Sequence, residues 1–176
     1  MFKKNFTGPK EKRTLTAEQA LPRLLTYCAY QERSPAEVEQ KMRGFGLDPA
    51  DQQKLLEQLH EMNYLNESRF VQSFTSGKHR LSGWGSRKIS MGLAAKGIDR
   101  ETIKEATSTL NDTETYYERL LEVLQRRFVA QYHRLPAPEA YQKLFRMGIS
   151  RGYEVDLVKR AVKQAMMGDF EPDEEE

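Results

Sequence analysis

The sequence has a single cysteine among its 176 residues, Cys28, so it cannot form a disulfide within the chain. That usage favours a reducing compartment. Long hydrophobic runs are also missing, since no apolar stretch approaches the ~20 residues that a membrane span needs. The opening segment, MFKKNFTGPKEKR, is charged and lacks the apolar core of a secretory signal. We therefore expect a cytoplasmic protein in which Cys28 is a buried, structural thiol.

Signals for catalysis and for metal binding are equally scarce. The three histidines, His60, His79 and His133, are scattered, and no HExxH or GxSxG motif is present. The segment GWGSRK at residues 83–88 lacks the third glycine of GxGxxG, the length of a Walker A loop and a preceding strand. We therefore expect no catalytic residue, no metal site and no cofactor in a protein that is not an enzyme.

Strand signals are nearly absent as well. The sequence has no sustained alternation of apolar and polar residues and no Asn-Gly or Asp-Gly hairpin turn. Apolar residues recur at helical spacing throughout and are interrupted at Gly, Pro, Asp and Ser. This pattern predicts an all-α chain.

Charge is present in both signs but is unevenly distributed. Residues 1–13 carry five cations and one carboxylate, whereas residues 169–176 carry six carboxylates and no cation. Segments of this composition are typical of solvated tails. The body between them has a net charge of about +4, which is modest for a dedicated DNA-binding protein.

A repeat of 51 residues organises this body. Gly46, Gly97 and Gly148 recur at that step, and each is followed by an aliphatic residue and then by Asp48, Asp99 or Ser150. We expect each glycine to end a helix in the left-handed conformation and each following Asp or Ser to cap the next helix. A fixed step with matching residue roles is typical of tandem modules.

The repeat predicts three helices in each module. Their expected ranges are 17–31, 35–44 and 49–62, then 67–80, 86–95 and 100–110, then 113–133, 137–147 and 151–167. We divide the chain into a basic flexible tail (1–15), three three-helix repeats (16–65, 66–111 and 112–168) and an acidic tail (169–176). Because a module of this size rarely holds a core alone, we expect the repeats to stack into an elongated, curved, right-angled array.

The only tryptophan, Trp84, lies in the segment LSGWGSRKI at residues 81–89. At the 51-residue step Gly85 takes the place of Ser34, a predicted helix cap, so this segment predicts a helix that starts at Ser86. Trp84 is then placed to pack against Ile89 as a hydrophobic staple, and this interpretation is favoured over a platform on which a base stacks.

Cations gather around this predicted helix start. Residues 77–100 contain six of them against one carboxylate, Asp99. Arg87 and Lys88 fall in the first turn, where the helix dipole disfavours a cation by about 0.3–1 kcal/mol. The alternative is an ordinary solvated surface, but this penalty favours a site for an acidic partner, either a protein face or a nucleic-acid backbone.

Several short motifs carry a resemblance to a known family. They are Tyr64-Leu65, Ser68-Arg69-Phe70, Gly83-Trp84-Gly85 before basic residues, and Leu93-x-x-Lys96-Gly97-Ile98. Together they resemble the central repeat of the RecX family of recombination regulators. LLTYCAYQERSPAEVEQKMRGFGL resembles the first repeat and Arg151-Gly152-Tyr153 the end of the last, so the likeness covers about residues 17–167. Family members commonly have glycine in place of Asn63 and an acidic pair in place of Asn66 and Glu67.

The resemblance implies three tandem three-helix repeats and a partner. Proteins of this family bind the RecA recombinase, lie in the groove of its filament on single-stranded DNA, and block filament extension or promote filament loss. They thereby restrain ATP hydrolysis, strand exchange and the SOS response, and some also contact DNA. We expect this chain to be a monomer that binds the RecA filament, with single-stranded or double-stranded DNA as a further candidate partner.

The residues that we expect to contact the partner are the basic group around Trp84, with Arg69 in support: Arg69, Lys78, Arg80, Trp84, Arg87, Lys88 and Lys96. Tyr64, Phe70 and Leu93 are expected in the core. A competing hypothesis is a helix-turn-helix protein that binds DNA without RecA. A third is a structural adaptor with an unrelated partner.

Overall fold

The computed structural model describes residues 14–111 and 114–167. All regular elements in these ranges are helices, which confirms the all-α prediction. The described residues up to Phe70 form one compact unit, and those from Val71 onward form a second. Apart from residues 14 and 15, the predicted tails lie outside the described residues, as does the predicted start of a helix at residue 113. None of the helices described is long and apolar enough to cross a membrane.

The first unit contains three helices whose starts agree with the predicted caps. Helix α1 (Ala17–Tyr30) and helix α2 (Pro35–Gly44) each begin with a reciprocal capping box, made by Thr16 and Ser34 respectively. Helix α3 (Pro49–Glu61) begins after Asp48, whose carboxylate accepts the N–H of Asp51 at 2.9 Å. Each cap satisfies N–H groups that the first turn of a helix leaves open.

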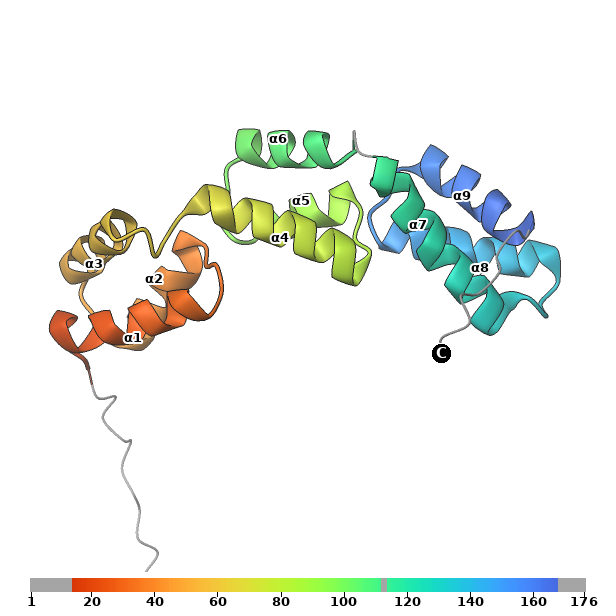
Figure 1. Cartoon of the computed structure of the whole chain (residues 1–176). Helices are drawn as coiled ribbons and strands as arrows, with labels where there is room; N and C mark the ends of the chain where they lie inside the picture. The colour runs from red at the N-terminus through yellow and green to blue at the C-terminus, as the bar shows by residue number, and fades with distance from the viewer. Residues whose placement is uncertain (1–13, 112–113, 168–176) are drawn as a thin grey trace, which may run out of the picture. The chain divides into compact units, whose positions relative to one another are not determined.

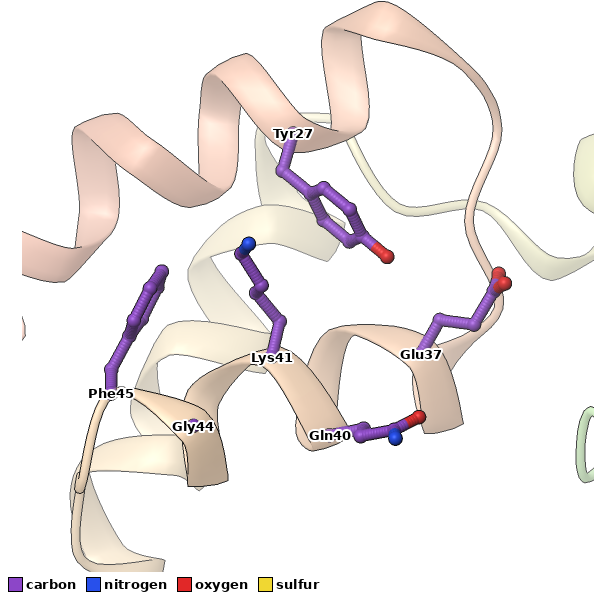
Figure 2. Close-up of a pocket in the computed structure, with 6 residues that line it drawn as sticks. All are labelled: Tyr27, Glu37, Gln40, Lys41, Gly44 and Phe45. Carbon is purple, nitrogen blue, oxygen red and sulfur yellow. The ribbon is translucent and has the colours of Figure 1, made fainter.

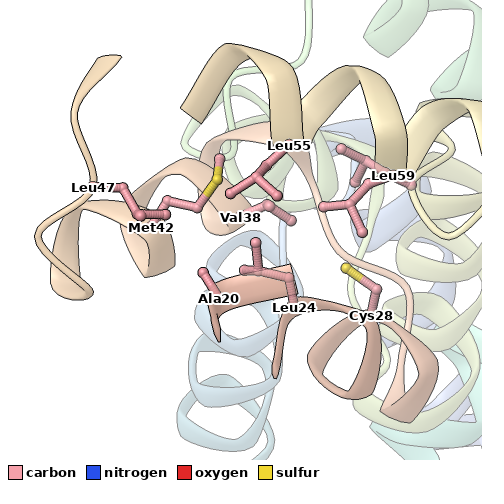
Figure 3. Close-up of a cluster of buried hydrophobic side chains, with 9 residues drawn as sticks. Ala20, Leu24, Cys28, Val38, Met42, Leu47, Leu55 and Leu59 are labelled. Atoms are coloured by element: carbon pink, nitrogen blue, oxygen red, sulfur yellow. The ribbon is translucent and has the colours of Figure 1, made fainter. Parts of the chain in front are cut away.

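The core of the first unit lies between these three helices. Figure 3 shows Leu24 of α1, Val38 of α2 and Leu59 of α3 pointing toward one another, and all three are fully buried. Cys28 belongs to the same cluster and is 6% exposed. Burial raises the pKa of its thiol, which keeps it in the unreactive protonated form. The prediction of a buried thiol is confirmed.

The second unit contains the remaining helices. Helix α4 (Glu67–Ser82) starts in the first unit and continues into the second, where α5 (Ser86–Ala94) and α6 (Arg100–Asn111) follow. Helix α7 (Glu114–Arg127) is extended by a single π-helical turn, η1 (Phe128–Tyr132), and packs with α8 (Ala137–Ser150) and α9 (Val155–Met167) (Figure 1). The centre of this three-helix bundle is formed by fully buried side chains such as Leu120, Leu144 and Val158.

The predicted helix ends are correct in two repeats and wrong in the third. Gly46 (φ +76°) and Gly97 (φ +80°) follow helices in the left-handed conformation, as expected. Gly148 instead lies inside α8, where an added Cβ would be 2.7 Å from Val158. The glycine that ends α8 is Gly152 (φ +87°), so Ser150 is the last residue of α8 and not a cap. The third helix of this repeat therefore starts at Val155 and not at residue 151.

One hydrogen-bond pattern closes the second helix of all three repeats. The N–H groups of Leu47, Ile98 and Tyr153 donate to the carbonyls of Met42, Leu93 and Gly148, at 3.4, 3.2 and 3.3 Å. This is the bond of a Schellman motif. The helix starts remain 51 residues apart, at the caps Ser34, Gly85 and Pro136. Helix α8 thus contains about one additional turn.

Among the expected core residues, Phe70 and Leu93 are buried, but Tyr64 is 39% exposed and its prediction is wrong. Tyr64 follows Asn63, which has a φ of +58°. This is the position at which family members commonly have glycine, and asparagine is one of the few other residues that enter this region readily. The turn at Asn63 ends the α3 segment and directs Leu65, not Tyr64, into the core.

Leu24→Ala should lower the free energy of unfolding of the first unit by about 2–5 kcal/mol, because it leaves a cavity at a fully buried position. Chemical denaturation followed by circular dichroism measures this change. The control in the same unit is Tyr30→Ala, whose side chain is 83% exposed and should contribute less than about 0.5 kcal/mol. Equal effects of the two substitutions would contradict this assignment of the core.

Candidate functional site

The segment around Trp84 starts a helix, as predicted. Gly85 is the N-cap residue of α5, in an extended conformation, and Ser86 is the first helical residue. Because glycine has no side chain, α5 has no side-chain cap of its own. The open N–H groups of its first turn must find other partners if they are removed from water.

Those partners come from the third repeat, within the same compact unit. The N–H of Ser86 donates to the hydroxyl oxygen of Tyr116 at 2.9 Å, and the N–H of Arg87 donates to the carbonyl of Gly152 at 3.1 Å. The N–H of Gly85 donates to the carbonyl of Arg151 at 2.8 Å. The second and third repeats are thus joined by backbone hydrogen bonds at the start of α5.

Two glycines make this close approach sterically feasible. A Cβ added to Gly85 would be 2.6 Å from the carbonyl of Gly152, and one added to Gly152 would be 2.4 Å from the backbone nitrogen of Lys88. Gly152 also has a positive φ, which disfavours any other residue. The two chain segments can therefore meet in this geometry only with glycine at both positions.

Glu154 supplies the negative charge that the first turn of α5 lacks. Its carboxylate accepts the Ser86 hydroxyl at 2.6 Å and the Tyr116 hydroxyl at 3.0 Å. An anion at a helix N-terminus is stabilised by the helix dipole. This carboxylate offsets the cost of placing Arg87 and Lys88 in that turn, so the dipole penalty does not by itself require an external partner.

The second and third repeats each place a cation at the C-terminus of a helix in the other repeat. The Lys88 ammonium donates to the carbonyl of Ser150, the last residue of α8, at 3.2 Å. The Arg151 guanidinium donates to the carbonyl of Ser82, the last residue of α4. Both cations lie at helix C-termini, where the dipole favours positive charge. Lys88 therefore has a structural contact in addition to any role in binding.

A buried cluster of aromatic rings packs beside the hydrogen bonds that join the second and third repeats. The ring of His79 stacks on Tyr116 with centroids 5.4 Å apart, and Tyr116 lies 5.0 Å from Tyr153. The Nδ1 atom of His79 is 3.0 Å from the carbonyl oxygen of Trp84. Within the described part of the chain, the buried Nε2 of His79 and the hydroxyl of Tyr153 have no hydrogen-bond partner. The cluster fixes the backbone at Trp84 relative to the third repeat.

Two of the predicted site residues bracket the tryptophan, which lies between α4 and α5. The ammonium groups of Lys78 and Lys88 are 5.0 and 4.9 Å from its ring centroid, within the range of cation–π attraction. The ring of Phe74 meets it edge to face at 6.5 Å. We call Lys78, Trp84, Arg87 and Lys88 the Trp84 patch. Arg87, the exposed member, lies in the first turn of α5. The staple contact between Trp84 and Ile89 stays a prediction.

The other predicted residues are not brought into this patch. Arg80 is exposed two positions after Lys78 on α4, and residues at that spacing lie on different faces of a helix. Lys96 follows the far end of α5 and is only partly exposed. Arg69 lies in the first unit, where it pairs with Glu32 at 2.8 Å and donates to the carbonyl of Asn63 at 2.8 Å. Its guanidinium is thus engaged in holding the start of α4.

A second feature, which the sequence analysis missed, lies on the first repeat. An open groove of about 310 Å³ between α1 and α2 is lined by Tyr27, Glu37, Gln40, Lys41, Gly44 and Phe45 (Figure 2). The Arg33 guanidinium lies 3.9 Å from the ring centroid of Tyr27, and the Lys41 ammonium lies 5.3 Å from the same centroid. The groove therefore combines two aromatic rings with one cation and one carboxylate, and Arg33 stacks on the Tyr27 ring that forms one of its walls.

This groove and the Trp84 patch occupy equivalent places in their repeats. At the 51-residue step, Tyr27 corresponds to Lys78 and Arg33 corresponds to Trp84. In the first repeat the ring is Tyr27 and the cation is Arg33. In the second repeat the equivalent of Tyr27 is a cation, Lys78, and the ring comes from Trp84. Both repeats therefore have a cation–aromatic pair, but the ring and the cation have exchanged positions. The sequence alignment of the repeats was anchored on the glycine motifs. Extending it back to the first helix of each repeat would have revealed this correspondence.

No arrangement suited to metal binding occurs in residues 14–111 and 114–167, where no group of three or more His, Cys, Asp or Glu side chains could hold an ion. The site is a surface of cations and aromatic rings, supported by a network of hydrogen bonds between repeats. Such a surface can bind anionic and aromatic groups.

Comparison with known proteins identifies what the chain is similar to. A family model described as the second three-helix domain of RecX matches residues 66–106, and one described as the third three-helix domain of RecX matches residues 114–162. A regulatory protein RecX of Leptothrix cholodnii is 32% identical over 143 residues, which cover 81% of this chain and 87% of that relative.

Other relatives are longer than the part matched. The regulatory protein RecX of Bacillus subtilis is 27% identical over 153 residues, which cover 87% of this chain but 56% of the relative. The chain thus spans a little over half the length of that protein. The crystal structure of RecX from Lactobacillus salivarius has a TM-score of 0.73 at 18% identity and covers 86% of this chain and 97% of that one. That likeness supports the tandem-repeat fold.

Gly152→Ala should destabilise the second unit by more than about 1–2 kcal/mol, because alanine is disfavoured at φ +87° and its Cβ would collide with Lys88. Urea denaturation measures the change. Gly77→Ala is the control in the same unit: nothing lies within 4 Å of the added Cβ, and alanine in a helix interior should add about 0.5–1 kcal/mol. A loss of stability for both variants would refute the close-approach argument.

Tyr116 and Tyr153 should keep their phenolic protons above pH 10 in the folded chain. Burial raises the pKa of Tyr116 to about 12 and raises the pKa of Tyr153 as well. The unfolded chain loses these protons near pH 10, so their stabilisation is complete below pH 10 and is lost as pH rises toward about 12. Ultraviolet absorbance of tyrosinate measures their ionisation.

Tyr116→Phe and Tyr153→Phe should each remove part of the absorbance that appears above pH 10. Two variants that leave this late absorbance unchanged would show that the cluster is not buried as described.

Proposed function

The chain belongs to the RecX family, and on this premise we propose that it binds the RecA recombinase as a filament on single-stranded DNA and restrains that filament. The expected consequences are inhibition of filament extension, of ATP hydrolysis, of strand exchange and of the co-protease activity that starts the SOS response. The chain would act by binding in the cytoplasm, as a monomer and without a catalytic step of its own. DNA within the filament is a second expected contact.

The observation that carries this proposal is the pairing of cations with aromatic rings at equivalent positions of the first two repeats. Each pairing can bind an acidic surface and an apolar or aromatic group together. Repeated sites in one chain suit a partner that is itself a polymer of identical subunits, because a second contact follows the first at high effective concentration.

The residues proposed for this contact are those of the Trp84 patch, with Arg80 and Lys96 flanking it. Arg69 is left out, because its guanidinium already pairs with Glu32 and Asn63. Within the patch, Lys78 and Arg87 are the better residues to test. Lys88 also bonds the end of α8, so replacing it would disturb the junction between repeats.

We expect substoichiometric amounts of the protein to inhibit ATP hydrolysis by the cognate RecA on single-stranded DNA. The double substitution Lys78→Glu with Arg87→Glu should weaken this inhibition by about tenfold or more, since each reversed charge at an interface costs on the order of 1 kcal/mol. Titration of the protein against a fixed amount of RecA gives the concentration for half inhibition.

The matched control is Lys104→Glu with Lys163→Glu, which makes the same charge change at two exposed positions of α6 and α9. It should inhibit like the unaltered chain. Equal inhibition by both double variants would remove the Trp84 patch from the proposal. Failure of the unaltered chain to inhibit at equal amounts, together with direct and salt-sensitive DNA binding, would favour the helix-turn-helix alternative.

A further inference from the structure

The cations of the Trp84 patch lack carboxylate partners in the part of the chain that the structure describes. No Asp or Glu of those residues forms an ion pair with Lys78, Arg87 or Lys88. Glu154, whose carboxylate lies at the start of α5, is already engaged by the Ser86 and Tyr116 hydroxyls. The patch is therefore a positively charged surface with unused capacity for anions.

The sequence supplies an anionic segment that suits this surface. Residues 168–176, GDFEPDEEE, directly follow α9 and contain six carboxylates and no cation. Carboxylates of this segment can pair with the two lysine ammonium groups that flank the tryptophan. The basic residues 1–13, by contrast, carry the same sign of charge as the patch.

The length of this segment is sufficient to reach the patch. Helix α9 starts three residues after Gly152, whose carbonyl accepts the N–H of Arg87, and it contains 13 residues. At 1.5 Å per residue it extends about 20 Å away from the patch. The nine residues that follow can span up to ~30 Å when extended, so residues 173–176, which lie six or more residues beyond α9, can reach its starting end.

We propose that the acidic segment binds the Trp84 patch of the same chain through residues 173–176 when no partner is present, so that a partner must displace it. Attachment within one chain gives the segment a millimolar effective concentration, so weak individual contacts suffice. The contact is electrostatic and weakens with salt, because the screening length falls from about 8 Å at physiological ionic strength to about 3 Å at 1 M. The segment thereby sets a threshold for partner binding.

Trp84 allows this contact to be tested without any partner, because it is the only tryptophan and lies in the patch. The full chain is compared with a full-length variant in which the six carboxylates become amides: Asp169→Asn, Glu171→Gln, Asp173→Asn, Glu174→Gln, Glu175→Gln and Glu176→Gln. We expect their tryptophan emission to differ at low salt and to converge at high salt. Identical emission at low salt, with equal helix content by circular dichroism, would overturn the proposal.

A peptide of sequence GDFEPDEEE, added to the amide variant, should restore the emission of the unaltered chain in a saturable manner. Lys78→Glu with Arg87→Glu, introduced into the amide variant, should abolish this response, whereas Lys104→Glu with Lys163→Glu should preserve it. If the variant with Lys78→Glu and Arg87→Glu still responds to the peptide, the segment does not bind the Trp84 patch. An emission difference that grows with protein concentration would overturn binding within one chain and point to a second copy.

Only the competition with a partner rests on the proposed function. In the RecA assay, the amide variant should inhibit at a concentration several-fold below that of the unaltered chain. Equal inhibition by the two proteins would overturn the threshold while leaving RecA binding in place. If neither protein inhibits, the proposed function fails, and the emission experiment still decides whether the segment binds the patch.

Discussion

The close approach of the backbones at Gly85 and Gly152 is the constraint on which the second compact unit depends. Helix α5 begins at a residue that has no side chain to cap it, and the groups that accept the N–H groups at its start come from Tyr116, Arg151 and Gly152 of the next repeat. Because open N–H groups removed from water are costly, the second repeat is complete only when the third is in place. The junction is therefore part of the fold of both repeats.

The same contact determines the electrostatics of the surface above it. Glu154 supplies the anion that the first turn of α5 lacks, and Lys88 and Arg151 supply cations to the ends of α8 and α4. Each of these charges complements a helix dipole of the neighbouring repeat. As a result, the lysines beside Trp84 occupy fixed positions without being neutralised by carboxylates in the described part of the chain. A positively charged, aromatic surface is thus a direct product of the way the repeats join.

The chain belongs to the RecX family, and its own repeats share one feature that bears on the proposed function. Cation–aromatic pairs recur at equivalent places in the first and second repeats, with the cation and the ring exchanged between the two positions. Tyr27, Arg33, Lys78 and Trp84 are all half-buried, so each pair packs against its own repeat and also keeps part of its surface open to solvent. That open part is the surface on which the proposed function relies.

The sequence by itself determined the helices, their caps and the tandem repeat, because these depend on local rules: a hydroxyl or carboxylate before a helix, a glycine after it and apolar residues at helical spacing. It also located the start of α5 at Ser86 and the cations around Trp84. The sequence pattern wrongly predicted that α8 ends at Gly148. An additional turn of four residues leaves the buried face of a helix almost unchanged, so the apolar pattern does not distinguish an end at Gly148 from one at Gly152. Only the tertiary structure decided that Gly152 ends α8, that Tyr116 and Gly152 accept the first N–H groups of α5, that Arg69 is engaged internally and that Lys78 and Lys88 flank Trp84. Those relations join residues far apart in the chain, and helical periodicity carries no information about which residues meet across an interface between repeats.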